Sequence, residues 1–89
     1  MNEQEMLDRG SAAQGILDSE TFQAVTKELM DIYVNTLIQT APNDVKSRES
    51  AYYQIKSLQD IFAVLNQWVS AKDNILESHK EIQTNSEEE

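Results

Sequence analysis

The sequence predicts an all-α protein: an antiparallel helical hairpin with a short helix before it and a long C-terminal helix. Apolar residues recur every three or four positions from residue 22 to residue 76, which is the period of an amphipathic helix. That run is interrupted once, at residues 40–44. The 89 residues include only two glycines and one proline, so long helices are easily accommodated. A chain this short usually needs close packing or oligomerisation to be stable.

The first element, residues 1–17, is expected to be a weak helical arm. Its apolar positions lie at helical spacing, but Gly10 and Gly15 lower its helix propensity. We therefore expect a short or frayed helix over about residues 3–14. Its apolar positions are Met6, Leu7, Ala13, Ile16 and Leu17.

The second helix is predicted from Glu20 to residue 39 or 40. Either Asp18 or Ser19 can cap its start, because their side-chain oxygens accept from free backbone N–H groups. Pro42 disfavours helical geometry at the residue before it, so the helix ends there. One face carries Phe22, Val25, Leu29, Ile32, Tyr33 and Leu37.

The third helix is predicted from Asp44 to about Lys80, with Asn43 as its cap. It has two apolar stripes. The main stripe is Tyr52, Ile55, Leu58, Phe62, Leu65, Val69 and Leu76. The second stripe is Tyr53, Ile61, Val64, Trp68, Ala71 and Ile75. Residues 81–89 are expected to form a disordered acidic tail, which leaves residues 18–80 as the hairpin domain.

The second stripe predicts a partner for the third helix. At 1.5 Å per residue this helix is about 55 Å long against about 30 Å for the second helix, which can cover only half of it. Each large side chain left in water forgoes about 1.5–3 kcal/mol of burial. Either the first helix or a second chain must cover the rest, and we favour a second copy because the first helix is short. The predicted interface is Tyr53, Ile61, Leu65, Trp68, Val69 and Ile75.

The charge of the chain argues against nucleic acid as a direct ligand. The net charge is −9, and most of it lies at the two ends of the chain. Repulsion would oppose binding to a phosphate backbone. No apolar run approaches the ~20 residues that cross a bilayer, and the acidic N-terminus lacks the apolar core of a signal peptide. We expect a protein of the cytoplasm, with no membrane partner.

No catalytic, cofactor or metal site is predicted. The chain has no cysteine, and its single histidine, His79, lacks the glutamate three residues earlier that a helical di-iron site needs. The carboxylates of Glu28 with Asp31, and of Asp73 with Glu77, are spaced for one helix face, but no apolar residues enclose them. A solvated charged face explains them better than acid–base chemistry. The serines have no base at a recognisable spacing, and we expect no enzyme activity.

Three segments resemble a set of small phage and prophage proteins. They are Ile16-Leu17-Asp18-Ser19-Glu20-Thr21-Phe22, Thr40-Ala41-Pro42-Asn43-Asp44 and Arg48-Glu49-Ser50-Ala51-Tyr52. The similarity spans about residues 9–72 and rests on helix caps and core positions. It implies a phage-encoded interaction protein, found in the host cytoplasm or the virion, and it transfers no catalytic residue. The acidic tail is not part of the pattern.

Two functional hypotheses follow from these observations. The first is a non-enzymatic protein that self-associates through the third helix and takes part in virion assembly. The second is an acidic inhibitor of a host enzyme that binds DNA, acting through the charged ends of the chain. The first depends on the apolar stripe and the second on residues 1–20 and 81–89.

Overall fold

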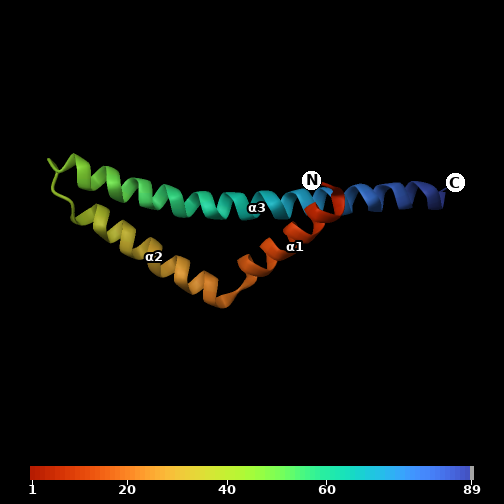
Figure 1. Cartoon of the computed structure of the whole chain (residues 1–89), viewed down its shortest axis with the longest axis horizontal. Coiled ribbons are helices and arrows are strands. Elements are labelled where there is room, and N and C mark those ends of the chain that lie inside the picture. The colour runs from red at the N-terminus through yellow and green to blue at the C-terminus, as the bar shows by residue number, and fades with distance from the viewer. Residues whose placement is uncertain (89) are drawn as a thin grey trace. The chain divides into compact units, whose positions relative to one another are not determined.

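The computed structural model describes the backbone of residues 1–88 and the side chains of residues 1–82, and it confirms the all-α fold. It contains α1 (Glu3–Asp18), α2 (Glu20–Gln39) and α3 (Val45–Glu88), drawn in Figure 1. The contacts form two compact units. The hairpin unit is residues 18–63, in which α2 packs on the first part of α3. The terminal unit joins residues 1–17 to the described residues from Val64 onward.

The first helix is longer than its composition predicts. It runs from Glu3 to Asp18 and includes both glycines, and the side chain of Asn2 caps it by accepting from the N–H of Glu5 at 2.8 Å. An isolated helix of this length is marginal, so tertiary packing decides whether it forms. That packing is present, because α1 lies against the later part of α3 and buries Gly10 and Ala13.

The break between α1 and α2 is a single residue, Ser19. Its Oγ accepts from the N–H of Phe22 at 3.2 Å, so Ser19 is the cap of the two candidates, and its ψ of 122° interrupts the helix. The break also corrects the phase of the apolar stripe. In a continuous helix the five-residue step from Leu17 to Phe22 would rotate the stripe by about 140°. A non-helical residue here lets each helix use its own apolar side.

The connection from α2 to α3 begins at Thr40 and differs from prediction at its end. The Thr40 hydroxyl donates to the Leu37 carbonyl at 2.7 Å and closes α2. Asp44, not Asn43, caps α3: its carboxylate accepts from the N–H of Ser47 at 3.1 Å and from the Ser47 hydroxyl at 2.7 Å. The N–H of Asp44 donates to the carbonyl of residue 41 at 3.0 Å, and this turn places Asp44 at the start of the helix.

The Asp44 cap predicts a pH-dependent contribution to stability. Hydrogen bonds from the Ser47 hydroxyl and N–H lower the pKa of Asp44 below its usual 3.8. A lowered folded-state pKa means that the stabilisation is present above pH 3.8 and is lost as pH falls through the folded-state value. We expect Asp44→Ala to have a lower melting temperature than the wild type at pH 7, and the gap to narrow at pH 2–3. Asp44→Asn should retain most of the cap, so a loss equal to that of Asp44→Ala would contradict the assignment.

The third helix ends later than predicted. It continues through residues 81–88, which the sequence analysis assigned to a disordered tail, and Glu89 lies outside the described residues. The physical reason is that no proline or glycine follows Pro42, so nothing in the sequence stops the helix at Lys80.

The core of the hairpin unit is small. Ala51 and Leu58, seven residues apart on α3, are buried, and the rings of Phe22 and Phe62 lie 5.6 Å apart across the two helices. Thr26 is also buried, and its hydroxyl donates to the Phe22 carbonyl at 2.8 Å, so this polar group is satisfied within α2. The predicted main stripe of α3 therefore begins with Ala51 rather than with Tyr52, which is exposed.

Candidate interaction surfaces

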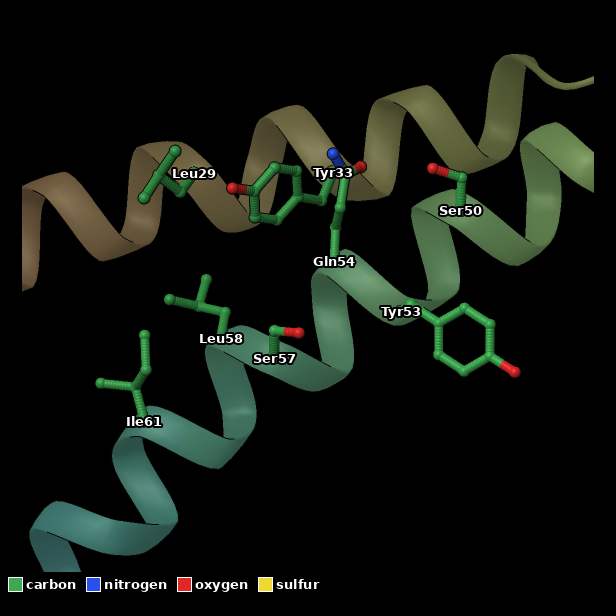
Figure 2. A pocket seen from close by; sticks show the side chains of 8 residues that line it. All are labelled: Leu29, Tyr33, Ser50, Tyr53, Gln54, Ser57, Leu58 and Ile61. Atoms are coloured by element: carbon green, nitrogen blue, oxygen red, sulfur yellow. The ribbon is translucent and has the colours of Figure 1, made fainter.

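An open groove of about 420 Å³ lies between α2 and α3 in the hairpin unit. Figure 2 shows Leu29 and Tyr33 on α2, with Leu58 and Gln54 of α3 pointing toward them and Tyr53 pointing away from α2. The complete lining is Leu29, Tyr33, Ser50, Tyr53, Gln54, Ser57, Leu58 and Ile61. No lining residue is charged, although 26% of the chain is.

Two exposed apolar side chains of α2 lie next to the residues that line this groove. Val25 and Ile32 lie four residues before and three residues after Leu29, so they share its side of α2. Both are half exposed, as is Ile61, and Tyr53 is 64% exposed. We call this surface the hairpin face. Its members are Val25, Leu29, Ile32, Tyr33, Tyr53 and Ile61.

In the terminal unit α1 approaches α3 at Gly10. A Cβ atom at this position would lie 2.8 Å from the Trp68 carbonyl oxygen and would also overlap the Cβ of Lys72. Real Cβ contacts are longer, so only glycine permits this approach of the two backbones. Gly15, in contrast, faces open space.

Two side-chain contacts also join α1 to α3. The Arg9 guanidinium lies over the Trp68 ring, with Cζ 3.7 Å from the ring centroid, as in a cation–π interaction. Near the start of α1, Glu3 pairs with His79. Both members of that pair are about half exposed, so it contributes little stability.

The structure separates the six predicted interface residues into two groups. Tyr53 and Ile61 belong to the hairpin face and are exposed. Leu65 is only 8% exposed, and Trp68, Val69 and Ile75 are partly buried. Within this single chain, α1 lies on this part of α3, which is the other alternative named in the sequence analysis. Gly10 lets the first helix come close enough to cover Trp68.

The aromatic residues lie in separate parts of the structure. Phe62 packs on Phe22 inside the hairpin, and Trp68 lies beneath Arg9 in the terminal unit. Tyr52 and Tyr53 form an exposed edge-to-face pair with ring centroids 5.6 Å apart. Their positions fit core packing or an interface better than a ligand site.

The carboxylates that the sequence spaces along one helix face lie in solvent. The carboxylates of Glu28, Asp31, Asp73 and Glu77 are exposed, as expected of a solvated face. Within the described part of the chain, no three metal-ligating side chains converge. Over the same residues, no helix combines the length and apolar character needed to cross a bilayer.

The sequence analysis does not identify Arg9 and Gly10 as residues of the contact between α1 and α3. It considers Gly10 only for its low helix propensity. A usable signal was present, because Met6, Gly10, Ala13 and Leu17 follow the four-three spacing of a helix–helix seam. A glycine at such a position permits close contact between two helices.

No protein-family model, curated protein or solved structure matches this chain.

Proposed function

We propose that this chain is a non-enzymatic interaction protein that binds a second copy of itself through the hairpin face and acts in virion assembly. The observation that carries the proposal is the hairpin face itself, an uncharged groove flanked by half-exposed Val25, Ile32 and Ile61. Fully burying a large apolar side chain contributes about 1.5–3 kcal/mol, and these side chains are half exposed, so a partner that covers them would add about half of that for each.

The net charge of the chain does not prevent a second copy from occupying the hairpin face. Two chains of net charge −9 repel each other, but at physiological salt that repulsion is screened beyond about 8 Å. Like charges brought into direct contact would still oppose association. The hairpin face avoids this because none of its members is charged, and two such faces can meet without pairing or burying any ion.

The size of the face is adequate for a pair. Two helices about 10 Å wide and about 30 Å long present roughly 600 Å² per copy, or about 1,200 Å² in total. That total lies at the lower end of specific protein interfaces. The assembly role rests on the resemblance to small phage and prophage proteins, which suggests where such a pair would act.

The hairpin face is tested by charge insertion. We expect the wild-type chain to sediment as a dimer and Ile61→Asp to sediment as a monomer, because a carboxylate at a half-exposed site harms the pair more than the single chain. Sedimentation velocity over a range of concentrations measures both masses. The matched control is Ile38→Asp. Ile38 lies nine residues after Leu29, about 180° around the axis of α2, and is already 72% exposed.

Three results would overturn parts of this proposal. A wild-type monomer at every concentration would exclude self-association. Equal dimerisation of Ile61→Asp and the wild type would exclude the hairpin face. Unchanged particle yield with Ile61→Asp, in the phage or prophage that carries the chain, would exclude the assembly role.

A further inference from the structure

The surface of α3 around Trp68 admits a specific kind of occupant. The backbone of the covering helix lies so close that a single Cβ would meet the Trp68 carbonyl oxygen at 2.8 Å. A helix can lie in this way only if it carries glycine at the point of contact. It also needs a cation one residue earlier to stack on the Trp68 ring, as Arg9 does at 3.7 Å. These requirements describe α1.

The connection of α1 to the rest of the chain leaves open which copy supplies it. The hairpin unit is complete within residues 18–63, whereas the terminal unit combines segments from the two ends of the sequence. Ser19 alone links α1 to α2, and its backbone is already outside the helical region. A rotation at this residue redirects α1 without breaking a hydrogen bond inside either helix.

The contacts of α1 are also weak enough to open. Its buried residues are Gly10 and Ala13, which have little or no apolar side chain. Two glycines within the helix cost about 1 kcal/mol each relative to alanine. Its larger apolar residues, Met6, Leu7 and Leu17, are only partly buried, and a terminal segment packed in this way opens locally more easily than the whole chain unfolds.

We infer that α1 exchanges between copies, so that α1 of one chain lies on the Trp68 surface of another. The exchanged contact reproduces the contacts made within one chain, including Gly10 on Lys72 and Glu3 with His79. Such an exchange is an inexpensive way to link identical chains. It goes beyond the proposed function because it uses a separate surface, and together with a pair joined at the hairpin face it would link copies into an extended assembly.

The absence of native cysteine allows a direct test. Glu3→Cys is placed on one full-length chain and His79→Cys on a second, which carries a size tag. The two chains are unfolded together, refolded and treated with a short bismaleimide. Exchange brings the two thiols together, so we expect a cross-linked species of mixed mass on a denaturing gel.

The matched control replaces His79→Cys by Lys46→Cys on the tagged chain. Lys46 belongs to the hairpin unit, on which α1 does not pack, so exchange does not bring its thiol to position 3. We expect at least fivefold less mixed product from this pair. Equal yields from the two pairs would overturn the exchange. So would a Glu3→Cys/His79→Cys double variant that forms only the intrachain product when the mixed pair forms none.

The same experiment separates the exchange from the proposed function. It is repeated with Ile61→Asp on both chains, which disables the hairpin face. Mixed product that persists shows that the exchange stands even if the hairpin face fails. Mixed product that disappears overturns the claim that the exchange uses a separate surface.

Discussion

Replacing Gly10 by alanine is expected to displace α1 from α3 and to destabilise the chain by about 1–3 kcal/mol, the usual cost of overpacking. The new methyl group meets the backbone oxygen of Trp68 and the Cβ of Lys72, neither of which can move away by rotating a side chain. Alanine also favours helix by about 1 kcal/mol, so the loss would occur against local propensity. The measurements are urea unfolding and the emission of Trp68, which should shift to longer wavelength as its ring loses the cover of Arg9.

Gly15→Ala is the matched control for this prediction. A Cβ at position 15 has no atom within 4 Å, so the same substitution in the same helix gains propensity without a clash. We expect it to stabilise the chain by up to about 1 kcal/mol and to leave the Trp68 emission unchanged. Similar behaviour of the two variants would contradict the close approach at Gly10. Because the contact is the same within one chain and between chains, this result does not depend on exchange.

The fold was largely predictable because its strongest signals are local. Ser19 is a cap whose mechanism depends on one side chain and the next turn of backbone, and Pro42 acts on the residue immediately before it. The predicted bounds of α2 therefore agree with Glu20–Gln39. The predicted cap of α3, Asn43, is wrong. Either Asn43 or Asp44 can cap a helix, and the turn before Asp44 places Asp44 at the start of α3.

The extent of α1 was less predictable because it depends on distant residues. Gly10 lowers helix propensity when α1 is considered alone, but the missing side chain is what lets α1 pack beside Trp68. Helix propensity alone treats Gly10 as destabilising, whereas in the folded chain it permits close contact between α1 and α3. The end of α3 differs from the prediction for a simpler reason: apolar periodicity stops after Lys80, but a helix can continue without it.

The candidate surfaces were predicted only in part. The sequence correctly indicates that α3 has more apolar surface than α2 can cover. It does not determine what covers each stretch, since α1 and a second copy can both present an amphipathic helix. Ile61 and Leu65 show the consequence. They lie four residues apart in the predicted interface, yet Ile61 is half exposed and Leu65 is buried.

Leu58→Ala tests the packing of the hairpin and is expected to cost about 2–5 kcal/mol. Leu58 is 5% exposed and is one of the few large side chains buried in the hairpin unit. At roughly 0.05–0.15 kcal/mol per residue, a chain of 89 residues has about 4–13 kcal/mol of total stability, so the loss is a large fraction of it. Leucine and alanine both favour helix, and the change in unfolding free energy therefore reports lost packing rather than lost helicity.

The control for Leu58→Ala is Ile38→Ala, which removes a branched aliphatic side chain of equal size from a site on α2 that is 72% exposed. Truncation there removes little buried surface, and alanine is the better helix former, so we expect a change within about 0.5 kcal/mol. Urea unfolding followed by circular dichroism measures both variants under identical conditions. A cost for Leu58→Ala as small as that for Ile38→Ala would mean that α2 does not pack on α3 at this position. In that case the groove beside Leu58 would have no fixed walls, and the hairpin face could not offer a second copy a defined surface.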